Sequence, residues 1–377
     1  MSKGANVGHS LNTNSGETVD LAIENASTLP SHYYVAPQVL EKEKRSIFWR
    51  MWQIVGRSEQ VRSAGDYFTA DLLGEPLLIL RGADGTLRGF YNVCRHRAGP
   101  PAEGSGSRKV FRCGYHGWTY GLDGRLLNAP EMDGVKNFCA EDLRLRPIHV
   151  GEWEGQVFAN LDPNAEPPNV EPLMDALCEL PLQAAKYNLG KMRLCGRREY
   201  HMQCNWKIYI DNYLEGYHLP SVHPSLNREL DYNSYVTTLF ENHSLQCSPI
   251  RGPENESSVD RRYKQSDGDL SAEYFWIFPN WMLNCYPDNV SLNIVLPTGP
   301  ETCMAIFEWY FPPDQGTAIE ETMRFSNEIQ LEDGHICEVV HRNLKSQSYD
   351  TGRYSVKQEQ GVHHFHLLYL DAIHSGG

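Results

Sequence analysis

Between residues 53 and 162 the apolar positions come in short runs, and turn-forming pairs separate these runs. The stretch GDYFTADLLGEPLLILRGADGTLRGFYNVC places such runs on both sides of the turn signal Asp84-Gly85. This spacing predicts antiparallel hairpins. The segments YGLDGRLL and WEGQVFANLDP continue the pattern further along the chain. We therefore expect a small all-β domain over residues 53–162.

The chain before this domain has a different pattern. Residues 1–28 are polar and poor in aromatic side chains, so we expect a mobile tail. In PQVLEKEKRSIFWRMWQIVG the apolar positions recur near helical spacing with charges between them. Residues 29–52 are therefore predicted to form a helical segment that packs on a larger catalytic domain.

The chain after residue 162 combines strand and helix patterns. The proline-rich stretch DPNAEPPNVEP is the predicted domain boundary. From residue 173 to residue 377, apolar runs such as FWIFPNWMLNCYP alternate with helical patterns at 205–219 and 325–344. The fold class expected for the whole chain is α+β, with an antiparallel sheet and helices in the larger domain.

Composition narrows the possible partners and the cellular location. The formal net charge of -14 argues against nucleic acid, because counterion release needs a basic surface. The N-terminal stretch lacks the apolar run of a signal peptide, and no segment reaches the ~18 apolar residues of a membrane span. We expect a cytoplasmic protein, in which clustered cysteines indicate metal binding or catalysis.

Two tight loops each offer one cysteine and one histidine. Cys94 and His96 have one residue between them, Cys113 and His116 have two, and 16 residues separate the pairs. A zinc finger would instead place two close cysteines before two close histidines. One cysteine and one histidine per loop suit a two-iron cluster in which thiolates hold one iron and imidazoles hold the other. The spacing resembles the Rieske motif, and CGYHGWTY resembles its second loop. The prediction is a Rieske [2Fe-2S] domain.

A second metal site is predicted in NWKIYIDNYLEGYHLPSVHPSL. Glu215 and His218 are three residues apart and would share one face of a helix. Pro220 would end that helix and let His223 turn back beside His218. Two imidazoles and one carboxylate form the triad of non-haem iron(II) sites with open positions for dioxygen.

Together the two sites resemble the catalytic subunit of a Rieske non-haem iron oxygenase, over residues of about 30–370. The resemblance implies that an aspartate on a late helix completes the iron site. EIQLEDGHICEVVHRNL matches that helix, and it favours Asp333 over Glu332 as the ligand. It also implies that Glu215 transfers electrons between subunits, from the cluster ligand His116, in a homotrimer. The role of Asp211, one helical turn before Glu215, stays open.

The resemblance further implies a multicomponent enzyme that uses O2. A ferredoxin- or flavin-type reductase would supply electrons from NAD(P)H, because no strand-GxGxxG-helix fingerprint for NAD occurs in the chain. Glutamate at position 215 resembles the branch that acts on carnitine, glycine betaine and choline. Aromatic rings could form a cage for such a cation. The rings expected near the iron are Tyr209, Tyr213, Tyr217, Phe275, Trp276, Trp281 and Tyr286.

Three functions are therefore considered. The first is hydroxylation or N-demethylation of a quaternary ammonium compound. The second is oxygenation of an aromatic ring or O-demethylation of an aryl ether, which could use the same aromatic surfaces for stacking. The third is electron transfer by a Rieske protein that is not an oxygenase, and the set His218, His223 and Asp333 argues against it.

Overall fold

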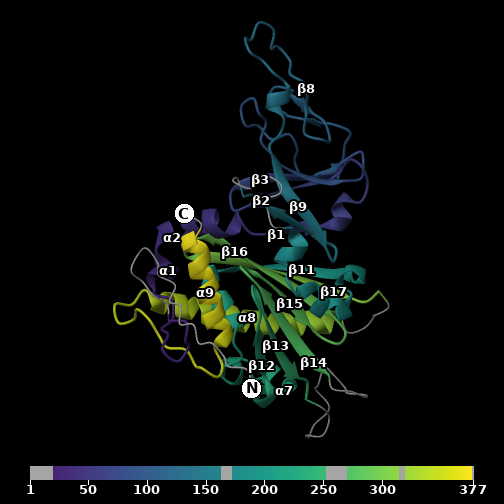
Figure 1. Cartoon of the computed structure of the whole chain (residues 1–377). Coiled ribbons are helices and arrows are strands. Elements are labelled where there is room, and N and C mark those ends of the chain that lie inside the picture. The colour runs from purple at the N-terminus through teal and green to yellow at the C-terminus, as the bar shows by residue number, and fades with distance from the viewer. Residues whose placement is uncertain (1–19, 163–171, 252–269, 314–318, 376–377) are drawn as a thin grey trace, which may run out of the picture. The chain divides into compact units, whose positions relative to one another are not determined.

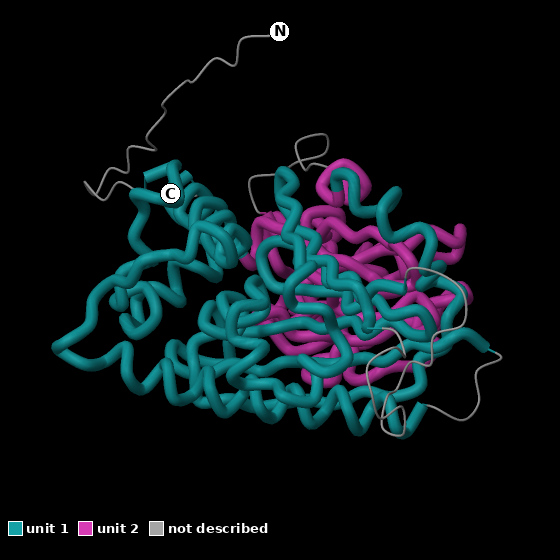
Figure 2. The backbone as a smooth tube through the Cα atoms, turned by 90° about the horizontal axis from the view of Figure 1, so that it is seen from below, with its two compact units in different colours: residues 1–47, 178–377 teal, residues 48–177 magenta. Residues whose placement is uncertain are grey.

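A computed structural model of the chain describes residues 20–162, 172–251, 270–313 and 319–375. The chain forms two compact units, one of residues 48–177 and one that joins residues 1–47 to residues 178–377 (Figure 2). The limits predicted from the sequence for the all-β domain were residues 53 and 162. Most of the proline-rich boundary, residues 163–171, lies outside the described residues.

The unit of residues 48–177 is built on antiparallel sheets. Its main sheet has the order β1-β10-β9-β4-β3-β2-β5, and a smaller sheet has the order β6-β7-β8. Figure 1 labels β1, β2, β3, β8 and β9 of this unit. The strands of the main sheet are β1 (Gln53–Arg57), β2 (Asp66–Leu72), β3 (Glu75–Arg81), β4 (Leu87–Tyr91), β5 (Ser105–Ser107), β9 (Pro147–Trp153) and β10 (Gln156–Asn160). The smaller sheet contains β6 (Phe111–Arg112), β7 (Thr119–Tyr120) and β8 (Leu126–Asn128). The hairpin β3–β4 turns at Asp84-Gly85, as predicted, with Gly85 at a φ of +79°.

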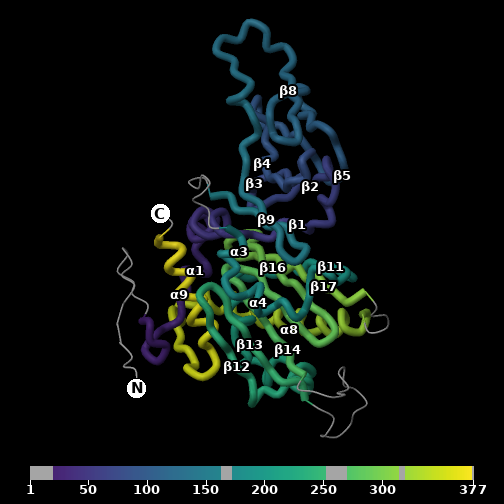
Figure 3. Tube along the Cα trace, turned by 45° about the vertical axis from the view of Figure 1, so that its right-hand side comes forward, coloured from purple at the N-terminus to yellow at the C-terminus, as the bar shows by residue number. Residues whose placement is uncertain are grey.

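The second unit contains a seven-stranded antiparallel sheet with the order β11-β17-β16-β15-β14-β13-β12 (Figures 1 and 3). Its strands are β11 (Arg193–Met202), β12 (Val236–Leu239), β13 (His243–Pro249), β14 (Ser271–Ile277), β15 (Trp281–Cys285), β16 (Val290–Gly299) and β17 (Thr302–Phe311). Central strands β14 and β16 are buried almost throughout, as expected for strands covered on both faces. The predicted α+β class is confirmed.

Helices position the functional residues of this unit. α5 (Trp206–Tyr213) packs against α8 (Ile319–Leu344), α9 (Gln360–Ser375) and strands β16 and β17. Shorter helices are α1 (His32–Val35), α2 (Pro37–Glu43), α4 (Leu180–Ala184), α6 (Leu219–Val222) and α7 (Leu226–Glu229), and α3 (Leu173–Ala176) belongs to the other unit. Within the described ranges no helix is both long and apolar enough to cross a membrane.

A buried ion pair connects the N-terminal segment to the helices of its unit. Lys207 on α5 and Glu43 on α2 are fully buried, and Lys207 Nζ lies 2.5 Å from Glu43 Oε1. Glu43 also accepts hydrogen bonds from Trp206 Nε1 at 2.9 Å and from the Tyr369 hydroxyl at 2.8 Å. The carboxylate therefore has three donors from α5 and α9, which fixes α2 against both helices.

Residues 20–28 pack against the rest of the chain. These residues were predicted as part of a mobile tail, but Ala26 is buried and Ser27 forms a β-bridge with Arg353. Backbone N–H of Thr28 also donates to the carbonyl of Gly352 at 3.1 Å. The backbone of this short polar segment is thus satisfied by the C-terminal region of the chain, which sequence pattern alone does not reveal. Residues 1–19 lie outside the described part.

Candidate functional site

Two short helices replace the single helix expected over residues 205–219. Glu215 lies between them, and His218 and His223 cap the two ends of the second, so Glu215 and His218 do not share a helix face as predicted. Asn205 caps α5 by accepting a hydrogen bond from the backbone of Lys207 at 3.1 Å, and the helix ends at Tyr213. α6 then begins at Leu219, with Pro220 in its first turn. Proline fits there because a first-turn residue needs no backbone N–H. Pro220 thus starts a helix where it was predicted to end one.

The turn between the helices brings both histidines to one aspartate on α8. His223 Nε2 lies 2.9 Å from Asp333 Oδ1, and His218 Nε2 lies 3.6 Å from the same oxygen. One ligand atom from each of these three residues lies within 4.8 Å of the others. His223 is 1% exposed, while His218 and Asp333 keep 18% and 15% exposure. Two nitrogens and one oxygen on a partly open site fit iron(II) with free coordination positions.

Carboxylates hold the second nitrogen of each histidine. Glu215 Oε1 lies 2.5 Å from His218 Nδ1, and Glu215 Oε2 accepts a hydrogen bond from the His218 backbone at 3.0 Å. Glu332 Oε2 lies 2.6 Å from His223 Nδ1. Burial lowers the pKa of His223, but Asp333 and then Glu332 outweigh it, so its pKa is raised from the ordinary value. The neighbouring acids Glu332 and Asp333 on α8 therefore contact different nitrogens of His223, with Asp333 at Nε2 and Glu332 at Nδ1.

These three residues line a cavity of about 100 Å³, and eight Tyr, Phe and Trp side chains are among the other described residues of its wall. A line of directly paired residues crosses four strands and forms part of this wall: Tyr274, Asn284, Ser291 and Trp309. The Tyr274 and Tyr286 hydroxyls are hydrogen-bonded to each other at 2.8 Å, and the Tyr213 hydroxyl donates to Asn284 Oδ1 at 2.6 Å. These bonds hold the rings in place before any ligand binds.

Tyr213, Tyr235 and Tyr274 of this cavity keep their phenol protons near neutral pH, because the pKa of each is raised. Burial is the main cause that raises the pKa of Tyr213 and Tyr274 well above the usual value, and neighbouring tyrosines add to it. Burial, followed by Glu215, raises the pKa of Tyr235 as well. A cationic ligand would therefore meet ring faces and phenol oxygens rather than phenolates.

The prediction of the cavity's aromatic residues was right for some of them. Tyr209, Tyr213 and Tyr286 line the cavity, whereas Tyr217, Phe275, Trp276 and Trp281 are absent from its described lining. Tyr217 is 57% exposed, and Phe275 and Trp276 are buried elsewhere in the sheet. The aromatic lining residues that were not predicted are Tyr235, Tyr274, Phe307, Trp309 and Phe325. Period-two alternation along β14 and β17 was the available signal, but only the strand register selects the correct face.

A second cavity, of about 300 Å³, meets the first at three residues. Asn212, Glu215 and His218 line both cavities. The second cavity also contains Asp211 and Glu359. Burial is the main cause that raises the pKa of Glu359, and the charges of Glu215 and Asp211 add to it. Glu215 therefore lines both the aromatic cavity and this second cavity, which we call the acidic cavity after Asp211, Glu215 and Glu359, although about half of its lining is apolar.

Asp211, whose role the sequence left open, has its hydrogen-bond partners on α1 and α9 rather than at the site of His218, His223 and Asp333. Its Oδ2 accepts a hydrogen bond from the Tyr34 hydroxyl at 2.7 Å, and its Oδ1 lies 2.9 Å from His366 Nε2. The Tyr354 hydroxyl lies 2.5 Å from the other nitrogen of His366. Burial, followed by Asp211, raises the pKa of Tyr34 well above its usual value. Asp211 thus ties α5 to α1 and α9.

In the unit of residues 48–177, the two Cys-His loops have matching backbones. The N–H of Ala98 donates to the Cys94 carbonyl and that of Gly117 to the Cys113 carbonyl, each at 3.0 Å. Both closing residues have positive φ, 60° for Ala98 and 76° for Gly117. A Cβ atom on Gly99 would lie only 2.9 Å from Cys113 Sγ, so glycine there lets the loops approach each other.

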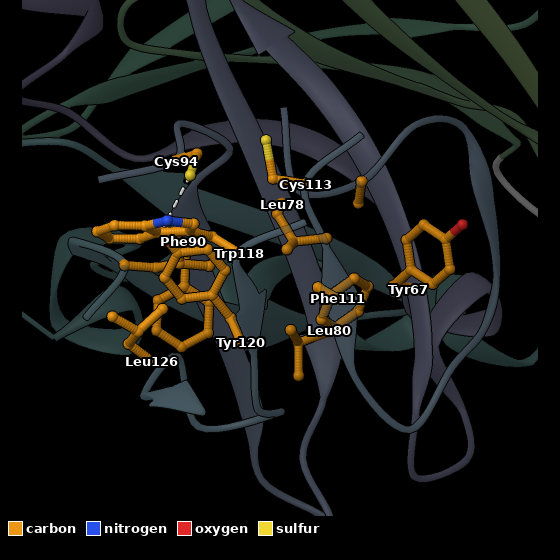
Figure 4. Packing of buried hydrophobic residues seen from close by; sticks show 12 residues of the cluster. Tyr67, Leu78, Leu80, Phe90, Cys94, Phe111, Cys113, Trp118, Tyr120 and Leu126 are labelled. Carbon is orange, nitrogen blue, oxygen red and sulfur yellow. Dashed lines mark hydrogen bonds between the residues drawn. The ribbon is translucent and has the colours of Figure 1, made fainter. Parts of the chain in front are cut away.

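The side chains of these loops fit a cluster with two thiolate and two imidazole ligands. Cys94 and Cys113 are buried in the hydrophobic core of this unit (Figure 4), and the His96 and His116 ring centroids are 4.6 Å apart. His96 Nδ1 is buried without a hydrogen-bond partner among the described residues. A buried nitrogen of this kind suits metal ligation. His116 is exposed, so the histidine side of the pair is the accessible one.

The Tyr120 hydroxyl forms a hydrogen bond with the sulfur of Cys94. The hydroxyl oxygen lies 3.2 Å from Cys94 Sγ and accepts a hydrogen bond from the Arg95 backbone at 3.0 Å. Burial, followed by Cys94, raises the pKa of Tyr120, so its phenol stays protonated and would be the donor to a Cys94 thiolate, which has no proton to give. Such a hydrogen bond stabilises the reduced state of an iron–sulfur cluster and raises its potential.

Two family models match the chain, and they match its two units separately. The Rieske [2Fe-2S] domain matches residues 51–139, and the ring hydroxylating alpha subunit (catalytic domain) matches residues 189–375. Choline monooxygenase of Arabidopsis thaliana is 36% identical over 360 residues, which cover 92% of this chain and 83% of the relative. This chain belongs to the Rieske oxygenases.

Further similarities agree with this family. The oxygenase subunit of carnitine monooxygenase from Escherichia coli K12 is 32% identical over 358 residues, and the match covers 92% of this Rieske oxygenase and 93% of the relative. A solved quaternary ammonium Rieske monooxygenase has a TM-score of 0.81 at 31% identity, covering 93% of this chain and 96% of the other. As a member of the family, this oxygenase uses a [2Fe-2S] cluster and a mononuclear iron, and it takes electrons from a reductase to oxidise a small molecule with O2.

Proposed function

We propose that this Rieske oxygenase hydroxylates or N-demethylates a small quaternary ammonium compound. The observation that carries this proposal is the 100 Å³ aromatic cavity beside His218, His223 and Asp333. A cation over aromatic faces gains roughly 0.5–2 kcal/mol per contact, and fixed neutral tyrosines provide such faces. The relatives named for choline and carnitine support the same substrate class.

In this proposal His218, His223 and Asp333 hold the mononuclear iron, and Cys94, His96, Cys113 and His116 hold the cluster. When bound, the iron supplies dioxygen activation and the cluster supplies single electrons. The chain's own residues orient the substrate and exclude water. Tyr213, Tyr274 and Tyr286 provide fixed rings, and the buried position of His223 limits solvent at the iron.

Glu215 is proposed to link the two metal sites across subunits of a homotrimer. Both of its oxygens contact His218, and the residue lines the 300 Å³ cavity on the side away from the substrate. An ionised carboxylate has about four acceptor positions, so Glu215 can also accept a hydrogen bond from His116 of the partner subunit. The exposure of His116 supports this role. The cytoplasmic location and the type of reductase stay predictions.

A peroxide-driven reaction tests the substrate class without the reductase. Purified, iron-loaded protein would be given hydrogen peroxide with choline, glycine betaine, carnitine and stachydrine, and separately with benzoate, phthalate and vanillate. Mass spectrometry and a formaldehyde assay would detect products. Product from the ammonium compounds is the expected result. Product from the aromatic compounds alone would refute the substrate class, and an iron content of only two per chain would refute the oxygenase site.

A further inference from the structure

Two neighbouring acidic residues on α8 contact opposite nitrogens of the same imidazole ring. Asp333 Oδ1 lies 2.9 Å from His223 Nε2, and Glu332 Oε2 lies 2.6 Å from His223 Nδ1. Successive side chains on a helix point about 100° apart, so they approach the ring from different sides.

This arrangement fixes both the tautomer and the orientation of His223. Because Nε2 must offer its lone pair to a metal, Nδ1 carries the proton, and its N–H donates a hydrogen bond to Glu332. His223 is 1% exposed, so the ring has little freedom to present its other nitrogen. We propose that Glu332 is a positioning residue that sets the metal affinity of the mononuclear site through His223. The inference rests on the proposed iron site.

Glu332 differs from Glu215, the carboxylate on the other histidine, in where it lies. Glu215 lines both cavities, whereas Glu332 is absent from the described lining of either one. Its side chain is 39% exposed on the outer surface of α8. Glu332 therefore meets neither the substrate space nor the acidic cavity. Its effect on the reaction passes through the His223 ring alone, which predicts a change in metal retention that does not depend on the substrate.

The test compares Glu332→Ala and Glu332→Gln with a control on the same helix. Glu328 is exposed one turn before Glu332, so Glu328→Ala and Glu328→Gln make matched changes of charge and size away from His223. The full-length proteins would be loaded with Co²⁺ at the mononuclear site and challenged with a chelator. The visible absorption of the cluster would count intact protein, and thermal unfolding would confirm the fold.

Loss of the outer partner of a ligand histidine typically lowers metal affinity about 10- to 100-fold. We expect a loss of this size for Glu332→Ala. Glu332→Gln should lose less, because its amide oxygen can still accept the Nδ1 proton. The electron paramagnetic resonance signal of Co²⁺, recorded with the cluster oxidised, should change in Glu332→Ala and recover toward wild type in Glu332→Gln. Both Glu328 variants should match the wild type.

Equal Co²⁺ release from wild type and Glu332→Ala would overturn the inference, and so would an equal loss in Glu328→Ala. An unchanged Co²⁺ signal in Glu332→Ala would also refute the positioning of His223. If the wild-type protein binds no metal beyond the cluster, the proposed iron site itself fails. The two failures can be told apart, because failure of the Glu332 inference alone leaves a wild type that binds the metal and a Glu332→Ala variant that binds it equally well.

Discussion

Breaking the buried pair of Glu43 and Lys207 should strongly destabilise the unit that contains the proposed iron site. Both side chains are fully buried and 2.5 Å apart at their charged atoms. Lys207 Nζ also lies 5.3–5.5 Å from three aromatic ring centroids. Burial lowers the pKa of Lys207, while the charge and hydrogen bond of Glu43 act in the opposite direction. The carboxylate is therefore what makes a charged lysine tolerable at this position.

Lys207→Met keeps an unbranched side chain one atom shorter than lysine and leaves the Glu43 carboxylate buried without its cation. Removal of one partner of a buried pair costs about 3–5 kcal/mol. With a urea m-value of about 3 kcal/mol/M, that cost lowers the unfolding midpoint by about 1–1.7 M. Glu43→Gln should cause a loss of the same order, because an unpaired lysine then stays buried, and the single amide oxygen of Gln can replace only one of the two oxygens that accept from Trp206 and Tyr369.

The double variant decides whether the pair is coupled. With both charges removed, neither is left unpaired, so the double variant should be more stable than the less stable of the two single variants. Urea unfolding followed by tryptophan fluorescence would measure all four proteins, with cluster absorption to report the other unit. Losses that simply add in the double variant would refute the coupling and would leave only lost packing as the cause.

Four further results are expected. Glu215→Gln should keep both metal sites but slow reductase-coupled turnover about 10- to 100-fold, and unchanged turnover would exclude a bridging role. His218→Ala should lose the mononuclear iron in metal analysis while the cluster spectrum stays, and a bleached cluster would contradict the site assignment. Tyr120→Phe removes the hydrogen bond at Cys94, which should lower the cluster potential in voltammetry by about 20–60 mV, whereas an equal or higher potential would show that the phenol does not donate. Tyr286→Leu should raise the KM for a quaternary ammonium substrate about 2- to 30-fold, with Tyr286→Phe close to wild type, and equal effects of both would count against a ring contact.

The residues that were predictable from the sequence are those whose spacing along the chain reflects a local geometry. The two Cys-His loops are of this kind, because each closes on its own backbone within a few residues. The all-β character of residues 53–162 was also predictable, since hairpin turns such as Asp84-Gly85 leave a local signal. The α+β class followed from the change of pattern after residue 162.

Features that depend on distant segments were not predictable. The line from Tyr274 to Trp309 exists only because three strand pairings set its register. The match to the late helix favoured Asp333 over Glu332 as the ligand, but the contact of Glu332 with the other nitrogen of His223 depends on the fold and was not predicted. Asp211 finds its partners on α1 and α9, more than 150 residues away in each direction along the chain. The prediction that Pro220 ends a helix was wrong, because proline breaks a helix interior but fits its first turn, and the sequence did not show that a new helix begins at Leu219.

The two cavities that meet at Glu215 and His218 have a consequence for inhibition. A compound that fills the acidic cavity would contact these residues from the side opposite to the substrate. It would leave the aromatic space free, so more substrate would not displace it. With the substrate in the aromatic cavity, as proposed, an inhibitor shaped for the acidic cavity would therefore act non-competitively, whereas one shaped for the tyrosine rings would compete with the substrate.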